Sequence, residues 1–327
     1  MSNKYFQYKW GKDTQPEIRF AEDEQVKLLC SGISFHIIKN LELINNNTKF
    51  INIPGKVFPI PYGQAYLHLL MDSIGGYLKL KRLYPDLRII FFDRGDFQSN
   101  AMGASKDLLD IMGAEIISAW TENFMFDEVF MFNLDIIPLP RHNFPMTKEA
   151  GYKEETSQEY RNFTNQSIPA IKKLLFSYLK EKKSPQFIYI SRKKDNKLMK
   201  DSVHEFEREH RYHDEIFDEY LEGQIIKLGY TIIELDSTSL IDQINLFYNA
   251  KVVAGIGGTN ILNAIFCKKQ SDVAQILINK KWDYHYDELI KNAGIENYID
   301  IDVRNFDNQK AIKYILNSLN LLINKHK

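Results

Sequence analysis

The sequence predicts an α/β protein of two domains, each built on a mostly parallel sheet. Short apolar segments rich in β-branched or aromatic residues alternate with longer segments of helical apolar spacing, and this alternation is typical of parallel sheets covered by helices. The length of 327 residues suits two domains of ordinary size. A polar stretch over residues 140–166 separates the two halves. We therefore expect domains at residues 1–165 and 166–327.

The first half contains four predicted strands and two predicted helices. Each strand segment is short, apolar and bounded by Pro, Gly, Asp or Asn, as buried strands are. The helices are expected over Gln64–Tyr84 and Ala104–Met112, and Gly113 stands where a helix C-terminus favours glycine. The predicted strands are Ile33–Ile38, Leu87–Phe92, Ala114–Ser118 and Glu128–Phe132.

The second half repeats this alternation more regularly, as a doubly wound domain does. The predicted strands are Gln186–Ser191, Tyr230–Leu235, Lys251–Ala254, Val273–Ile278 and Tyr298–Val303. The predicted helices are Ile168–Lys183, Asp214–Leu228, Leu240–Asn249, Thr259–Phe266 and Asp307–Ile323. The last helix has apolar spacing and basic ends, and we favour its packing against a domain, the first one included, over membrane contact.

Composition excludes several classes of protein. With 42 basic and 43 acidic side chains, the net charge argues against a disordered tail or a nucleic-acid binder. Cys30 and Cys267 could form at most one disulfide, so a reducing compartment is expected. No signal peptide or apolar stretch of about 18 residues is present. The chain is thus expected to be soluble and cytoplasmic, with contact to the inner face of the membrane left open.

A glycine-rich turn follows the predicted strand Lys251–Ala254. Glycines at 255, 257 and 258 let the backbone approach a ligand, and the following helix would present free N–H groups to a phosphate. A tight structural turn is the alternative reading. Asn260 stands where a dinucleotide-binding fingerprint requires glycine, and no P-loop is present. A nicotinamide-dependent dehydrogenase is therefore poorly supported.

Two further segments carry polar side chains at predicted element ends. Arg192 follows the strand Gln186–Ser191, at the edge where ligands bind in open α/β sheets, and arginine pairs bidentately with phosphate. Its alternative is a surface arginine in a basic run. Glu215 opens a helix, where it could cap the helix or contact a ribose or sugar hydroxyl. His68 and Asp72 share one helix face, either as a base and its carboxylate or as a structural pair.

Metal sites are weakly indicated. Asp300 and Asp302 form an Asp-x-Asp, but in an alternating run that predicts a strand. His204, His210 and His213 lack the spacing of a zinc site. No metal is therefore expected. The aromatic segment Trp282–Tyr286 could stack on a base or sugar, or form a surface loop.

Taken in order, these motifs resemble glycosyltransferase family 61. The chain shows H-x-x-x-D from His68, I-S-R ending at Arg192, R-x-x-[ND]-E from Arg211, and G-x-[HG]-G-x-x-[IL]-x-N from Gly255. The resemblance extends over about Tyr62–Ile278. The family includes protein O-linked N-acetylglucosaminyltransferases and plant xylan xylosyl- and arabinosyltransferases.

The resemblance implies a GT-B fold, in which two Rossmann-like domains face a central cleft. The carboxyl-terminal domain would bind a nucleotide-sugar, most often a UDP-sugar, and the amino-terminal domain the acceptor, with inverting, metal-independent transfer and no cofactor. Arg192 and Arg211 would face the donor phosphates, and Glu215 would support the donor site. The turn of Gly257, Gly258, Thr259 and Asn260 would cap the pyrophosphate, and His68 and Asp72 would reach the cleft from the acceptor side.

This chain departs from the family pattern in its glycine loop. Family members usually have histidine there, as in G-P-H-G-A-G, whereas this chain has Gly255-Ile256-Gly257-Gly258-Thr259-Asn260. Asp214 also replaces the more usual asparagine. Two functions therefore stay open. One is a transferase that moves a sugar to a hydroxyl of a glycan or lipid-linked glycan in surface polysaccharide assembly. The other is a non-catalytic nucleotide-sugar or glycan binding protein with a degenerate site.

Overall fold

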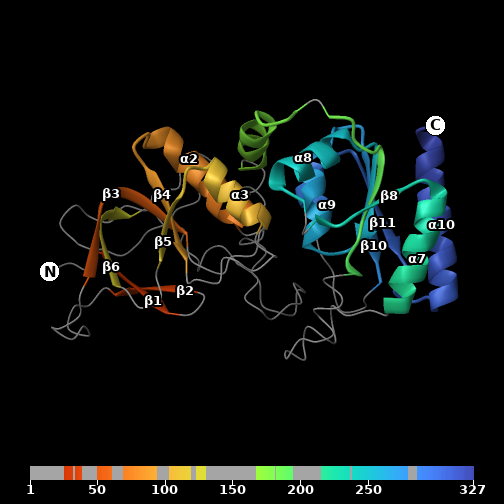
Figure 1. The fold of residues 1–327 in the computed structure, drawn as a ribbon, viewed down its shortest axis with the longest axis horizontal. Coiled ribbons are helices and arrows are strands. Elements are labelled where there is room, and N and C mark those ends of the chain that lie inside the picture. Colours follow the sequence, from red (N-terminus) through yellow and green to blue (C-terminus); the bar gives the residue numbers. More distant parts are fainter. Residues whose placement is uncertain are drawn as a thin grey trace. The chain divides into compact units, whose positions relative to one another are not determined.

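The structure is a computed structural model of an α/β protein, and its contacts divide the chain into two units (Figure 1). It describes residues 26–31, 34–38, 50–60, 69–93, 103–118, 123–129, 167–180, 182–193, 215–235, 238–278 and 286–327. The first unit comprises Met1–Leu139 and Lys153–Ile171, and the second Pro140–Tyr152 and Lys172–Lys327. The predicted boundary after residue 165 stays a prediction, because residues 130–166 lie outside the described part.

The first unit contains a mixed sheet in the order β2-β1-β6-β3-β4-β5. Its strands are β1 Val26–Ser31, β2 Ser34–Ile38, β3 Phe50–Ile60, β4 Arg88–Asp93, β5 Glu115–Ser118 and β6 Asn123–Val129. β6, β3, β4 and β5 run parallel, whereas β1 is antiparallel to both β2 and β6. The expected mostly parallel sheet is thus confirmed, with the β1–β2 hairpin as its antiparallel part. β1 and β3 were not predicted, and β6 begins before the predicted Glu128–Phe132.

The helices of the first unit follow the prediction with one difference. The helix expected over Gln64–Tyr84 is described as a π-helix, Leu69–Ile74, followed by α2, Gly75–Leu83. π-helical turns are rare and often occur at functional sites. Gly75 has no room for a side chain, because an added Cβ would lie 2.6 Å from the Cβ of Ser167. α3 covers Gly103–Ile111, and Gly113 has the positive φ, 64°, expected after a helix end.

The second unit contains a fully parallel sheet in the order β11-β10-β9-β7-β8. All five predicted strands are confirmed, as β7 Phe187–Ile190, β8 Thr231–Ile233, β9 Val252–Ile256, β10 Asp272–Leu277 and β11 Asn297–Asp302. Numbered along the chain, this order is 2-1-3-4-5, which is a doubly wound arrangement. The central strands β9 and β10 are buried throughout, as expected of strands covered on both faces.

Helices cover both faces of this sheet. α7, Glu215–Leu228, and α10, Asn308–Lys325, lie together on one side, and α8, Leu240–Asn249, and α9, Tyr286–Asn292, lie on the other (Figure 1). α7 and α10 share a core with the sheet, to which Leu221 and Ile315 contribute fully buried side chains. The last helix therefore packs on the sheet of its own unit.

Two predicted helices of the second half differ in the structure. Among its described residues, the segment Ile168–Lys183 is helical over 168–176, in a helix that begins at residue 167. Thr259–Phe266 forms a 3₁₀-helix rather than an α-helix. Within the part of the chain that the structure describes, no helix combines the length and apolar character needed to cross a bilayer.

Candidate functional site

The sheet of the second unit reverses its strand order at β7. The chain passes from β7 to β8 on one side and then crosses to β9 on the other side of β7. In open parallel sheets, ligands bind at the carboxyl ends of the strands that flank such a reversal, because the connections there diverge and leave a crevice. Arg192 follows β7, and the turn Gly257–Gly258 follows β9. The two predicted phosphate-binding elements therefore lie at neighbouring strand ends.

Arg192 is in direct contact with the glycine turn. Its Nη1 donates a hydrogen bond of 2.5 Å to the carbonyl oxygen of Gly257. A Cβ added to Gly258 would lie 2.9 Å from the same nitrogen and 3.0 Å from Cζ. Gly258 has extended backbone, with φ 161°, which any residue adopts. A side chain at 258 would therefore have to displace the guanidinium.

Gln275 supports the turn from within the sheet. Its side chain on β10 is fully buried, and a Cβ added to Gly257 would lie 2.9 Å from its Nε2. The Gln275 Oε1 accepts a hydrogen bond from the Tyr298 hydroxyl, whereas its Nε2 has no hydrogen-bond partner among the residues described. A side chain at Gly257 would thus meet a buried amide, and one at Gly258 would meet the Arg192 guanidinium.

A buried carboxylate organises the chain around Arg192. Glu222 of α7 is only 6% exposed. Its Oε1 accepts a 2.6 Å hydrogen bond from the Ser191 hydroxyl, and its Oε2 lies 3.1 Å from Nζ of Lys193. Glu222 therefore fixes the residues on both sides of Arg192, which restrains the direction in which the guanidinium points.

The surroundings of Arg192 combine charges of both signs. Asp218 lies one helical turn before Glu222 and is also buried. Burial, with a smaller effect from these two carboxylates, raises the pKa of the Tyr189 hydroxyl well above its usual value, while Arg192 acts in the opposite direction. The phenol thus stays neutral at physiological pH. The guanidinium stays charged, because arginine does not deprotonate in proteins, so the site can present a fixed positive charge to an anion.

The 3₁₀-helix after the turn is anchored on its buried side. Nδ2 of Asn263 donates a 3.1 Å hydrogen bond to Oε1 of Gln243 on α8. The first N–H groups follow Gly258, whose own carbonyl accepts from the Ile261 amide at 3.2 Å. Asn260, the last predicted residue of the turn, is half-buried in this helix.

Several predicted site residues fall outside the described residues. His68 and Arg211 lie there entirely, as do His204, His210, His213 and Trp282–His285. Asp72 is placed in the π-helix, Glu215 opens α7 and Thr259 opens the 3₁₀-helix, but their side chains are not described.

The metal alternatives gain no support from the described residues. Asp300 and Asp302 lie on β11 at the edge of the sheet, so the strand reading is confirmed. Both oxygens of Asp302 accept hydrogen bonds from the Arg304 guanidinium, at 3.0 and 2.6 Å. Among the residues described, no three His, Cys, Asp or Glu side chains are grouped to hold a metal ion.

Three residues that the sequence did not indicate take part in this arrangement. Glu222 and Asp218 stand four residues apart on a helix whose buried face is otherwise apolar, and that spacing is the one signal that could have identified them. Gln275 is a polar residue in an apolar strand, which suggests a buried hydrogen bond but not its partner.

Comparison with known proteins identifies the family. Comparison with curated proteins gives no match. The family model described as Glycosyltransferase 61 matches residues 61–274, which is more than half of the chain. The match begins directly after β3, includes Arg192 and the glycine turn, and ends within β10. The chain therefore belongs to glycosyltransferase family 61 and is a glycosyltransferase.

Proposed function

We propose that the second unit binds the nucleotide-sugar donor, most simply a UDP-sugar, at the carboxyl ends of β7 and β9. The observation that carries this proposal is the contact between the Arg192 guanidinium and the turn Gly257–Gly258 at the strand reversal. The guanidinium supplies a fixed charge for the diphosphate, and the glycines leave the backbone accessible at close range. Arg211 would add a second charge, and Glu215, Thr259 and Asn260 would line the same site.

The proposed reaction is an inverting transfer without a metal. The acceptor hydroxyl attacks the anomeric carbon, the bond from that carbon to the diphosphate oxygen breaks, and its electron pair leaves with the nucleoside diphosphate. Arg192 and Arg211 would stabilise the negative charge that develops on the leaving group, which is the role a metal has in other enzymes. The proton of the hydroxyl goes to a base, for which His68 and Asp72 are the candidates.

The first unit would supply the acceptor side in a GT-B arrangement. Closure of the two units would exclude water and so limit hydrolysis of the donor. The acceptor we propose is a hydroxyl of a glycan or lipid-linked glycan in surface polysaccharide assembly, reached from the cytoplasm at the inner face of the membrane. The absence of a histidine from the turn makes a binding protein without chemistry the competing outcome.

A thermal-shift panel tests donor binding. UDP, GDP, ADP, CMP and NAD are each added with EDTA and with Mn²⁺ to the native protein, Arg192→Ala and Arg304→Ala. Arg304 is the matched control, because its guanidinium pairs with Asp302 on β11. At about 100 times its dissociation constant, a ligand specific to the native state adds roughly 2.7 kcal/mol. We expect stabilisation by UDP that EDTA does not change, that Arg192→Ala loses and that Arg304→Ala keeps.

Other outcomes decide against parts of the proposal. Two results would contradict a donor site at this strand reversal. One is stabilisation by NAD alone, and the other is an equal loss of UDP stabilisation in both arginine variants. Stabilisation that requires Mn²⁺ would contradict metal-independent binding. Release of UDP from a UDP-sugar distinguishes the enzyme from a binding protein. The enzyme should hydrolyse the donor slowly even without acceptor, and the binding protein should not hydrolyse it. His68→Ala and Asp72→Asn should lower transfer to an acceptor and leave UDP binding unchanged, and weaker UDP binding would contradict their placement.

A further inference from the structure

A basic cavity lies at the opposite edge of the second sheet, where the strands begin. It has a volume of about 430 Å³ and is lined by Lys182, Lys183, Ser184, Gln186, Asn249, Ala250, Lys251, Lys268, Gln270, Ser271 and His326. Gln186, Lys251 and Ser271 directly precede β7, β9 and β10. β9 has five residues, which at a rise of about 3.3 Å each separates this cavity from the Arg192 site by roughly 16 Å.

Among the described residues, the lining carries four lysines and one histidine and no carboxylate. Three of the five have partners: Lys182 pairs with Asp242 at 2.9 Å, the ammonium of Lys268 lies 4.7 Å from the Tyr248 ring centroid, and His326 binds Asp272. Within the part of the chain that the structure describes, no carboxylate lies within ion-pair distance of Lys183 or Lys251. Lys251 is half-buried, and a partly buried charge is costly unless an opposite charge compensates it.

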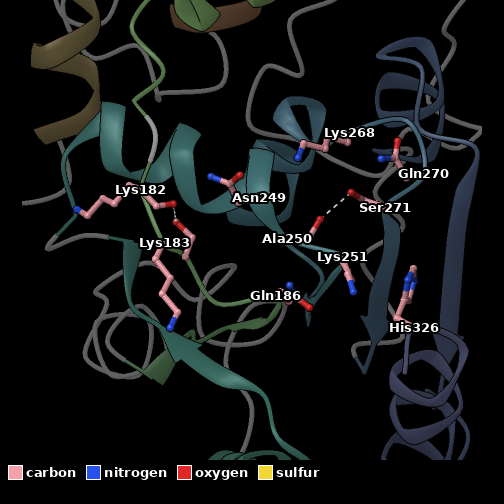
Figure 2. Close-up of a pocket in the computed structure, with 11 residues that line it drawn as sticks. Lys182, Lys183, Gln186, Asn249, Ala250, Lys251, Lys268, Gln270, Ser271 and His326 are labelled. Carbon is pink, nitrogen blue, oxygen red and sulfur yellow. Dashed lines mark hydrogen bonds between the residues drawn. The ribbon is translucent and has the colours of Figure 1, made fainter.

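Figure 2 shows how the groups are arranged. In this view Lys251 lies between Gln186 and His326, while the side chains of Lys182 and Lys183 extend away from it (Figure 2). Ser271 donates a 2.7 Å hydrogen bond to the Ala250 carbonyl, which ties the starts of β9 and β10 together (Figure 2). This part of the lining is therefore held in place by the sheet, and Gln186 and Lys251 are drawn next to one another beside it (Figure 2).

His326 is held in a defined orientation. Its Nε2 lies 2.7 Å from Oδ2 of Asp272, a fully buried carboxylate that also binds Lys325 at 2.7 Å. A carboxylate can only accept, so Nε2 carries the proton. The imidazole is thereby fixed at the cavity edge by a buried partner, and it is not a freely rotating surface group.

We propose that this cavity is a second binding site, separate from the donor site, for a small ligand that carries a phosphate or diphosphate group. Its size is that of a small-molecule site. Lysine binds phosphate as a point charge, and the amides of Gln186, Asn249 and Gln270 add hydrogen bonds. Of the lining residues that the structure describes, only His326 carries an aromatic ring, so the ligand is recognised by its charge and not by stacking of a base. The phosphate could belong to a soluble molecule or to a phospholipid headgroup.

Pyrophosphate is the probe, titrated calorimetrically into Arg192→Ala so that the donor site does not contribute. We expect Lys183→Gln with Lys251→Gln to weaken binding about tenfold or more, and the corresponding double arginine variant to keep it. Lys227→Gln with Lys313→Gln is the matched control, because it removes the same charge from exposed positions on α7 and α10. Equal weakening in this control, or unchanged binding in the Lys183 and Lys251 double variant, would overturn the proposal.

Sedimentation with phosphatidylcholine vesicles, with and without phosphatidic acid, distinguishes the two sources of phosphate. Binding to the acidic vesicles that pyrophosphate displaces and that the double glutamine variant loses assigns the site to a headgroup. Binding of pyrophosphate without vesicle binding assigns it to a soluble ligand. If Arg192→Ala binds neither, the cavity is not a phosphate site. Because the native donor site is not needed for any of these readings, failure here leaves the proposed function unaffected.

Discussion

Replacing Gly258 with alanine should weaken donor binding and leave the fold nearly unchanged. The added Cβ would lie 2.9 Å from Nη1 of Arg192, 3.0 Å from Cζ and 3.3 Å from Nε. Since heavy atoms in contact normally stand about 3.5 Å or more apart, the guanidinium must move by at least about 0.6 Å. It is half-buried and ends a flexible side chain, so it can move where backbone could not.

The magnitude follows from what that displacement breaks. The hydrogen bond from Nη1 to Gly257 O loses its geometry, which costs about 0.5–1.5 kcal/mol in folding. The backbone contributes no strain, because φ at Gly258 is extended. A misplaced guanidinium loses its charge-assisted bonds to the diphosphate, worth about 1.5–3 kcal/mol, or about 10- to 150-fold in affinity.

Two other glycines calibrate this effect. Gly257→Ala brings a Cβ 2.9 Å from Nε2 of Gln275, and since Gln275 is fully buried, the clash should cost about 1–3 kcal/mol in stability. Gly223→Ala on α7 meets no atom within 4 Å and should stabilise the protein by about 0.5–1 kcal/mol. Urea unfolding and UDP titration are measured for all three. Native UDP affinity in Gly258→Ala, or a larger loss of stability there than in Gly257→Ala, would refute the reasoning.

Three further changes test the second unit. Burial raises the pKa of Tyr230, so its contribution to stability is present below about pH 10 and is lost as pH rises further, by up to about 1.4 kcal/mol per pH unit. Urea unfolding of Tyr230→Phe should therefore show a shallower alkaline loss, and an equal slope would contradict this. Asp272→Ala should lower the free energy of unfolding by about 1–3 kcal/mol. This is less than the loss of about 3–5 kcal/mol typical of a broken buried ion pair, because Lys325 is 54% exposed and its ammonium regains water. Amide hydrogen exchange should also become faster at the end of α10 near His326. Glu222→Gln should lower the free energy of unfolding, measured with urea, by under about 1 kcal/mol, because its partner Lys193 is 39% exposed. A larger loss would show that the charge of Glu222 is itself needed.

The second half was predictable because its strands are short, apolar and bounded by turn residues. β9 and β10 are buried on both faces, so their sequences are mostly apolar, with Asp272 and Gln275 of β10 as the polar exceptions. The loop after β9 needs glycine for close approaches, which the sequence displays directly. Local pattern and tertiary environment agree here, and all five strands follow.

The first half was harder because one strand contains residues that normally end strands. β3 includes Pro54, Gly55 and Pro59 and still pairs with β6 and β4. The structure accommodates the first two through a register shift between Ile53 and Lys56, where Gly55 has φ 78°. A bulge of this kind depends on the neighbouring strands, and a single sequence does not reveal them.

Arg192 and the glycine turn of the candidate site were predictable from local sequence, whereas Glu222 and Gln275 were not. Arg192 and Gly257 each lie within two residues of a strand end, so a rule about strand ends identifies both. Their contact joins residues 192 and 257, which are 65 positions apart, and it exists because β7 and β9 are neighbours in the sheet. Glu222 and Gln275 act through α7 and β10, so their parts in the site depend on strand order and helix packing and not on local pattern.

The two units share a topological feature that relates to both groups of candidate residues. In the first sheet, β3 pairs with β4 on one side and β6 on the other, while the chain runs from β3 to β4 and β5 before it crosses to β6. The strand order therefore reverses at β3, as it does at β7 in the second sheet. The segment that carries His68 begins after β3 ends at Ile60, and Arg192 follows the end of β7. Each unit thus has its own candidate residues after the strand at which its sheet reverses, which is where such sheets bind ligands.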